Sequence, residues 1–286
     1  MNGETYRFNV GKFECIAIND GTFIYNAGQY FANAPRDDLA RALRDHGVDP
    51  KRIPSPYTCL VVNTGAHQVL IDTGAGALTP NVGRLLQHLR TEGIAPEEID
   101  TVILTHGHPD HIGGNVDGEG NVVFRNARHV MWRDEWECWT DEANLERVAA
   151  QPLGALIADF ARKHLPPIKS QLDLVDRETE IVPGIHAIPA PGHTPGQMAV
   201  VVASGDDELL YISDAVIHPI HLEQPDWYPV FDLDPREAVA TKRRLFDRAA
   251  AERSLVLAFH FDPFPSLGHV VQRGRGWQWQ PIETGG

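Results

Sequence analysis

One ten-residue segment, THGHPDHIGG at 105–114, restricts the possible folds of this chain more than any other feature of its 286 residues. It follows an apolar run at 101–105 that predicts a buried strand, and it holds four potential metal ligands. The small Gly107 and the turn-forming Pro109 let the loop fold back, so side chains that would diverge along a strand can converge on a metal ion. A solvated polar loop is the alternative. The candidate ligands are His106, His108, Asp110 and His111.

Three further candidate ligands occupy comparable positions later in the chain. His193 lies in PGHTPG at 191–196, where glycine and proline predict a tight turn after a strand that ends near residue 188. Asp214 follows an apolar strand expected at 209–212, and His260 follows another at 255–259. Each of them alone is more typical of an ordinary polar residue at a strand end. Together with the first motif they predict a metal site.

The charge balance argues against nucleic acid as a partner. Asp and Glu total 39 against 25 Lys and Arg, which gives a net charge of −14 that would repel a phosphate backbone. The densest basic run, KRR at 242–244, falls in a segment with helical spacing and is interpreted as a solvated helix face. The 42% hydrophobic and 22% charged residues indicate a globular protein.

The N-terminus has no basic start followed by a long apolar run, and no segment reaches the roughly 18 apolar residues of a membrane span. We therefore expect a cytoplasmic protein without a membrane partner. Cys15, Cys59 and Cys138 are widely spaced, so they are expected to be reduced, buried and structural.

Helices and groups of strands alternate along the chain, which predicts a layered α/β fold instead of a continuous βαβ winding. We expect one domain over 1–286, in which 1–57 contribute strands and a helix. Residues 6–26 predict a strand pair around a turn at 19–21. Further strands are expected at 59–63, 68–71, 101–105, 122–124, 129–132, 172–175, 185–188, 198–202, 209–212 and 255–259, and helices at 37–46, 81–92, 133–164 and 235–251.

The order of the motifs, His-x-His-x-Asp-His followed by Gly-His, Asp and His, resembles the metallo-β-lactamase superfamily over about residues 58–270. The segment LIDTG at 70–74 extends the resemblance, because it matches a superfamily segment whose Asp lies beside the metal ligands. Asp72 takes that place here, although it could merely cap a turn. The resemblance implies an αβ/βα four-layer sandwich of two mixed β-sheets flanked by helices, with the metals at the sheet edge.

The resemblance also implies two divalent ions. Five imidazoles and two carboxylates suit zinc, with iron, manganese or cobalt as alternatives. A water bridging the ions would lose a proton near neutral pH, and the resulting hydroxide would be the nucleophile. Asp110 would be catalytic as well, orienting that hydroxide and passing a proton to the leaving group. The implied ligands are His106, His108 and His193 for one ion, Asp110, His111 and His260 for the other, and Asp214 as the bridge.

Departures from known branches of the superfamily reduce the number of activities that this chain is expected to have. Asp at 214 differs from the Cys ligand of many metallo-β-lactamases, and the 26 residues after His260 are too few for the glutathione-binding domain of glyoxalase II. Acidic charge argues against RNase Z-like nucleases. The segments FDLD at 231–234 and HFDPFPSLGHV at 260–270 resemble methyl parathion hydrolase-like enzymes, a subgroup that includes phosphotriesterases and lactonases.

Two features bear on the substrate pocket. Quorum-quenching lactonases often have Tyr three residues beyond the bridging Asp, where this chain has Ile217; His218, His221 or Tyr228 could replace it, and none is assigned. Trp132, Trp136 and Trp139 would share one face of a helix, where core packing is the alternative to a pocket wall. The candidate pocket residues are Trp132, Trp136 and His218.

We therefore expect a dinuclear metal-dependent hydrolase of a small, neutral, ester-like substrate, either a lactone or an organophosphate triester. The alternatives are a glyoxalase II-like thioesterase, a β-lactamase, an iron-dependent persulfide dioxygenase and a structural metal-binding protein. Seven ligands for two ions leave room for water and favour catalysis over a closed structural site. The resemblance further implies a possible homodimer, formed through the N-terminal residues 1–57.

Overall fold

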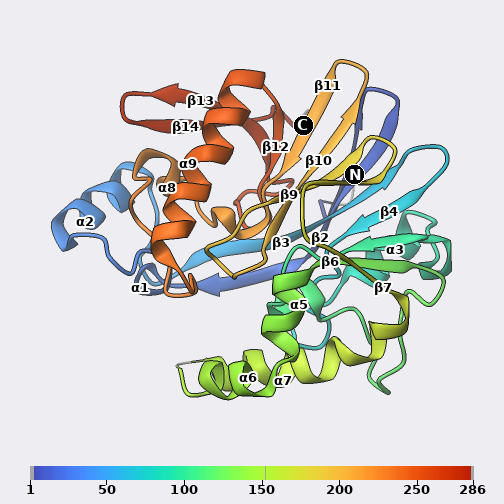
Figure 1. The fold of residues 1–286 in the computed structure, drawn as a ribbon. Coiled ribbons are helices and arrows are strands. Elements are labelled where there is room, and N and C mark those ends of the chain that lie inside the picture. The colour runs from blue at the N-terminus through green and yellow to red at the C-terminus, as the bar shows by residue number, and fades with distance from the viewer. Residues whose placement is uncertain (1–2, 152, 285–286) are drawn as a thin grey trace.

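Two β-sheets pack face to face at the centre of the fold, and helices cover their outer faces (Figure 1). The computed structural model describes residues 3–151 and 153–284. Helices α3 (Leu85–Thr91) and α5 (Arg133–Thr140) pack on the first sheet, whereas α8 (Ile220–Glu223) and α9 (Pro235–Glu252) pack on the second. The predicted four-layer αβ/βα sandwich of two mixed sheets is confirmed.

The first sheet has its strands in sequence order from β1 to β7. Neighbours pair antiparallel from β1 to β4 and parallel from β4 to β7. The bounds are β1 Thr5–Val10, β2 Phe13–Tyr25, β3 Ile53–Asn63, β4 Gln68–Ile71, β5 Thr101–Ile103, β6 Arg128–Trp132 and β7 Leu172–Val175.

The second sheet runs in the order β14 to β8. Strands β11 and β12 pair parallel, and the other neighbours pair antiparallel. The bounds are β8 Thr179–Val182, β9 Ile185–Pro189, β10 Met198–Ser204, β11 Asp207–Tyr211, β12 Leu255–Leu257, β13 Leu267–Arg273 and β14 Gly276–Pro281. The remaining helices are α1 Ala27–Tyr30, α2 Arg36–Asp45, α4 Pro109–Ile112, α6 Glu142–Ala149 and α7 Gly154–His164, with 3-10 turns η1 Pro96–Glu98, η2 Pro166–Gln171 and η3 Ser213–Ala215.

Strand β10 shows why the central strands are almost continuously apolar. Val200 and Val202 belong to the core between the two sheets, whereas Ala199 and Val201 pack with Leu245 of α9 on the opposite face. A strand covered on both faces needs apolar residues at every position. The two cores together fix the strand ends from which the functional loops leave.

The predicted turn at 19–21 is wrong, because β2 runs through these residues with a register shift between Asn19 and Thr22. The carboxylate of Asp20 accepts hydrogen bonds from the backbone N–H groups of Ala75, Gly83 and Leu85 at 2.8–2.9 Å. The turn-forming residues therefore make a bulge, which a long-range carboxylate contact stabilises.

Other boundaries also differ from the predictions. The helix expected at 81–92 begins at Leu85, and the strand expected at 122–124 is an isolated bridge between Val116 and Val122. Strands β8, β13 and β14 were not predicted. They lie at or next to the outer edge of the second sheet and are partly exposed, so their sequences contain no long apolar run.

The N-terminal segment is integrated into the molecule. Strands β1 and β2 form one side of the first sheet, and Ala27 and Tyr30 of α1 pack with Ile220 of α8. Helix α2 lies at the same end of the molecule (Figure 1). A homodimer through these residues stays a prediction.

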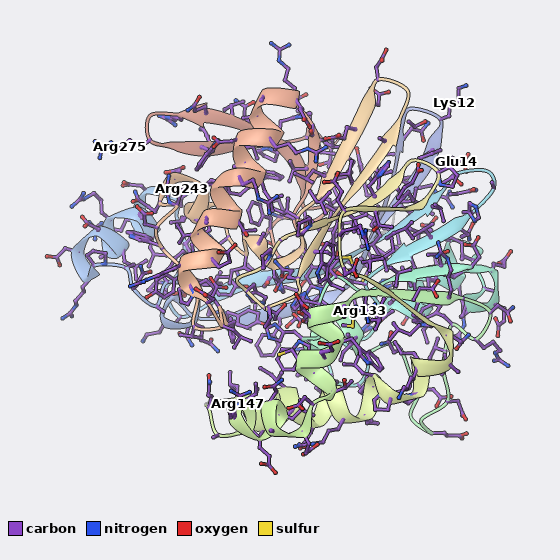
Figure 2. The ribbon with its side chains drawn as sticks, in the orientation of Figure 1. Lys12, Glu14, Arg133, Arg147, Arg243 and Arg275 are labelled. Atoms are coloured by element: carbon purple, nitrogen blue, oxygen red, sulfur yellow. The ribbon has the colours of Figure 1, made fainter. Side chains whose placement is uncertain are left out.

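Basic side chains project from separate parts of the surface. Figure 2 shows Lys12 at the β1–β2 hairpin, Arg147 on α6 and Arg275 at the β13–β14 hairpin, at three different extremities. The absence of a nucleic-acid partner stays a prediction.

None of the helices within the described residues is long and apolar enough to cross a membrane.

Candidate metal centre

The seven candidate ligands come together where strands of both sheets end. Parallel neighbours direct their following loops to one edge of a sheet, and β4–β5 and β11–β12 are such pairs. All seven residues are buried. His106 and His108 lie in the loop after β5, Asp110 and His111 in α4, His193 in the β9–β10 loop, Asp214 in η3 and His260 in the loop after β12.

The local sequence explains how the first loop brings its ligands together. His108 has an extended backbone (φ −74°, ψ 154°), and α4 begins directly after it at Pro109. Proline suits the first helical position, because its φ is already helical and the missing N–H has no partner there. A side chain at Gly107 would lie 2.3 Å from the ring of Trp139, so the loop requires glycine.

Among the described residues, three groups of three have ligand atoms that all lie within 4.8 Å of one another, and one of them, His106 with His111 and Asp214, joins the other two. In one of those two, Nδ1 of His108 lies 2.9 Å from Nε2 of His193, and His106 completes the set. In the other, Oδ2 of Asp110 lies 3.5 Å from Nε2 of His260 and 3.9 Å from Nε2 of His111. These two groups match the two predicted ligand sets.

The carboxylate of Asp214 lies between the two groups. Its Oδ1 is 3.2 Å from Nε2 of His111, and its Oδ2 is 3.0 Å from Nε2 of His260. The same Oδ2 is 3.5 Å from Nε2 of His193 and 4.0 Å from Nε2 of His106. One carboxylate thus faces imidazoles of both groups, as a bridging ligand must.

The residues fit divalent metal ions. Nε2 of His106, Nε2 of His111 and Oδ1 of Asp214 are buried and lack a hydrogen-bond partner among the described residues. The last two atoms are 3.2 Å apart without the alignment of a hydrogen bond. Burying such an atom unpaired costs about 1–3 kcal/mol, which coordination would offset. Imidazole and carboxylate are ligands that zinc, iron and manganese accept.

Burial and neighbouring charges favour the unprotonated forms of His106, His108 and Asp214. Burial lowers the pKa of His106 and of His108 well below the usual value, and neighbouring imidazoles lower it further. Burial raises the pKa of Asp214, but His260 and His111 outweigh it and hold that pKa well below the usual range. Metal ligands must be neutral imidazoles and ionised carboxylates, so the states of His106, His108 and Asp214 favour coordination. Burial lowers the pKa of His111, but Asp214 and Asp72 outweigh it and hold that pKa well above the usual value, so a metal ion would have to displace this proton.

Asp72 lies behind the centre, as the resemblance implies. Its Oδ2 is 2.8 Å from Nδ1 of His111, and its carboxylate also accepts hydrogen bonds from Thr105 and from the hydroxyl of Tyr211. The backbone of Asp72 is left-handed (φ 61°), a conformation that non-glycine residues rarely adopt. The contact on Nδ1 directs the other nitrogen of His111 toward the centre.

Two other imidazoles have comparable partners that sequence reasoning missed. Nδ1 of His193 is 2.8 Å from Oδ1 of Asp232. Nδ1 of His260 is 2.8 Å from the hydroxyl of Ser55, which accepts a hydrogen bond from the hydroxyl of Tyr30. Asp232 lies in the FDLD segment noted above, which was a usable signal, whereas no sequence pattern indicated Ser55.

Glu135 joins two of the ligand loops and was also missed. It is fully buried, and its carboxylate accepts hydrogen bonds from the backbone N–H of Gly107 at 2.8 Å and of Gly196 at 2.9 Å. Trp139 donates to the same carboxylate from the next turn of α5. Acidic residues in the first turn of a helix are usually solvated, so nothing in the sequence pattern singles out Glu135.

A cavity of about 210 Å³ opens on the centre at Asp110, Asp214 and His260. Its walls are mainly apolar and aromatic, and they include Ile217. Burial raises the pKa of the hydroxyls of Tyr25, Tyr30 and Tyr57 well above the usual value, so these phenols stay protonated. Further wall residues are Phe23, Leu78, Leu156, Ile157 and Phe231.

The predicted pocket residues lie elsewhere. Among the described residues that line the cavity, Trp132, Trp136 and His218 do not occur. Trp132 ends β6 instead of lying on a helical face, and Trp136 packs against the main core. His218 packs behind the wall, against Tyr30 and Phe31. Their contact with a substrate stays a prediction.

The chain is similar to known lactonases and hydrolases. The sequence profile of the metallo-beta-lactamase superfamily matches residues 52–260. An N-acyl homoserine lactonase of Bacillus cereus is 24% identical over 269 residues, which cover 86% of this chain and 94% of the relative. The N-acyl homoserine lactonase AiiA of Bacillus thuringiensis subsp. kurstaki is 23% identical over 253 residues, which cover 81% and 92%.

Two solved structures resemble nearly the whole chain. AidC, a dizinc quorum-quenching lactonase in complex with a hexanoyl-homoserine product, is 25% identical with a TM-score of 0.89, covering 99% of this chain and 98% of its own. The hydrolase AbOPH of the beta-lactamase superfamily is 26% identical with a TM-score of 0.91, covering 99% of both chains. With the metal-ligand geometry and the matching fold, these findings identify the chain as a metal-dependent hydrolase of the metallo-β-lactamase superfamily.

Proposed function

We propose that this protein hydrolyses N-acyl lactones at a dinuclear zinc centre. The observation that supports this most is a small, largely apolar cavity that opens directly on five of the seven buried ligand side chains. Such a cavity suits a neutral ester with an apolar substituent. The similarity to AidC and to the Bacillus lactonases supports the same substrate class.

The zinc assignment follows from the ligands and from a relative. His106, His108 and His193 would hold one ion, Asp110, His111 and His260 the other, and Asp214 both. Imidazole nitrogen with a few carboxylate oxygens is a preferred zinc environment. AidC, which is similar to 99% of this chain, is a dizinc enzyme.

The protein residues divide the remaining chemical work among themselves. Divalent ions bound by these residues would lower the pKa of a water, which could then act as the nucleophile, and would polarise the ester carbonyl. Asp110 lies in the cavity wall, where its carboxylate can accept a proton from the attacking water and deliver it to the leaving oxygen. Asp72, Asp232 and Ser55 hold their imidazoles in one orientation.

Leucines at the cavity mouth offer a place for an acyl chain. Leu153 and Leu156 line the cavity and yet are 54% and 46% exposed. Covering exposed apolar side chains beside a pocket removes their surface from water, which favours binding of an apolar ligand. An aryl phosphotriester is the second candidate substrate, because Phe23 and Phe231 give the cavity an aromatic wall.

We expect kcat/KM to be highest for lactones when four substrate classes are compared at equal metal content and ionic strength. The classes are N-acyl homoserine lactones, aryl phosphotriesters, glutathione thioesters and RNA. A chain of net charge −14 gives polyanions no evident anchor, so lactones should exceed thioesters and RNA by at least about tenfold, or 1.4 kcal/mol.

Two results would contradict the assignment. A tenfold preference for the glutathione thioester or for RNA would place the chain in another branch of the superfamily. Oxygen consumption with a persulfide by the iron-loaded protein, without lactone hydrolysis, would reject hydrolysis as the activity. Each metal is therefore assayed separately.

A further inference from the structure

Two tyrosine hydroxyls form a pair in the wall of the cavity. Tyr25 ends β2 and Tyr57 lies within β3, and both line the cavity. Their hydroxyl oxygens are 2.7 Å apart, a hydrogen bond in which either oxygen could be the donor. In the register of β2 with β3, Tyr25 lies opposite Ile53, four residues before Tyr57, so the two hydroxyls meet through the length of their side chains.

The pair holds one proton more than its mutual hydrogen bond uses. Each phenol has one O–H donor, and one of the two protons forms the bond between them. The second proton has no acceptor among the described residues. Tyr30 differs, because its hydroxyl donates to Ser55. The pair therefore presents a free donor at a mainly apolar wall.

The two tyrosines differ in exposure, which favours Tyr25 as the residue that holds the free proton. Tyr57 is 1% exposed, whereas Tyr25 is half-buried, and both line the cavity. The hydroxyl of Tyr57 can donate its hydrogen bond to the oxygen of Tyr25, which leaves the proton of Tyr25 free to bond a ligand. A donor whose oxygen also accepts a hydrogen bond is polarised by it and becomes a better donor.

Aromatic neighbours hold both rings next to the metal ligands. The ring of Tyr25 stacks on Tyr30 at 5.0 Å and meets the edge of Phe231 at 5.8 Å. The ring of Tyr57 stacks on Phe259 at 5.7 Å and meets His260 at 5.3 Å. A donor fixed in this way needs little rearrangement when charge develops on a substrate oxygen.

We propose that Tyr57 donates to Tyr25 and that Tyr25 donates its own proton to the carbonyl oxygen of the bound ester. This inference rests on the proposed ester hydrolysis and assigns a donor within the same cavity. The hydrogen bond strengthens as water adds to the carbonyl and negative charge gathers on that oxygen. Ile217, which also lines the cavity, has no polar atom for this purpose.

The test compares Tyr25→Phe, Tyr57→Phe and the double variant in the full-length, zinc-loaded protein, using N-hexanoyl homoserine lactone. Loss of one hydrogen bond to the charged reacting oxygen should lower kcat by about 10- to 100-fold in Tyr25→Phe, with KM changed much less. Tyr57→Phe should lower kcat by about threefold, because Tyr25 keeps its proton. The double variant should match Tyr25→Phe, since both changes act through one hydrogen bond.

Tyr6→Phe in β1 is the matched control, because it removes a phenol hydroxyl outside the cavity and should change neither constant. Bound zinc is measured in every variant. Wild-type kcat in Tyr25→Phe, with wild-type protein active, overturns the tyrosine proposal alone. Loss of zinc in Tyr25→Phe also overturns it, since the hydroxyl would then support the ligands. Failure of the wild-type protein to hydrolyse any ester would instead overturn the proposed function, and this inference with it.

Discussion

Replacing Asp110 with asparagine should lower kcat by about 10²- to 10⁴-fold and leave KM nearly unchanged. The amide of the Asp110→Asn variant would keep an oxygen near His260, from which the Asp110 carboxylate is 3.5 Å away, so the shape of the centre is retained. An amide cannot accept and release a proton at neutral pH. The loss therefore falls on the step in which the attacking water gives up its proton and the leaving oxygen gains one.

Steady-state kinetics at saturating zinc, with metal content measured in parallel, separate this role from metal binding. The control is Asp134→Asn on α5, which removes an exposed carboxylate and should leave kcat unchanged. Equal turnover by Asp110→Asn and the wild-type protein would remove Asp110 from proton transfer. A rise in KM without a change in kcat would show that Asp110 only helps to bind the substrate.

Replacing Glu135 with alanine should lower the free energy of unfolding by about 3–5 kcal/mol and weaken zinc binding. The change leaves three buried donors without their acceptor: the N–H groups of Gly107 and Gly196 and the indole of Trp139. Gly107 lies between two candidate ligands, and Gly196 follows His193 by three residues. Both loops therefore lose a common attachment, although Glu135 is not itself a candidate ligand.

Urea unfolding and zinc affinity are measured for Glu135→Ala, Glu135→Gln and the control Glu137→Ala. Glu137 is exposed on the same helix, so its replacement should change the unfolding free energy by less than about 0.5 kcal/mol. Glutamine keeps one acceptor oxygen, and its variant should fall between alanine and wild type. If Glu135→Ala unfolds and binds zinc as the wild-type protein does, Glu135 does not hold the loops.

The strand-end positions of the ligands could be predicted because their signals are local. Four of the seven candidates occur within 106–111, directly after an apolar strand. Asp214 and His260 each follow a short apolar run whose period indicates a buried strand. A buried strand fixes where its next residues emerge, so local hydrophobicity predicted which residues would meet.

Residues that act through long-range contacts could not be predicted. Asp20 resembles a turn residue in sequence, and the structure shows its carboxylate bound to three N–H groups that are 55–65 positions away. Ser55 reaches His260 across 205 positions. Glu135 has the sequence context of a solvated helix residue, yet it is fully buried. Such partners depend on how loops from different strands pack, which periodicity does not describe.

The walls of the cavity escaped prediction for the same reason. Phe23, Tyr25 and Tyr57 come from the first strands of the chain, far in sequence from every candidate ligand. The tryptophan cluster was more conspicuous, but Trp132 ends a strand and Trp139 packs against Gly107 beneath the metal-ligand loop. Aromatic composition indicated an aromatic pocket without indicating its residues.

Titration of zinc into the chelated, metal-free protein, with lactone hydrolysis and bound zinc followed together, tests the central claim most directly. The arrangement of two ligand groups around Asp214 predicts no hydrolysis in the metal-free protein. Activity should then rise and reach its plateau at two zinc ions per chain. Hydrolysis that persists without metal, or that reaches its plateau at one bound ion with no second ion binding, would contradict a dinuclear metal-dependent lactonase.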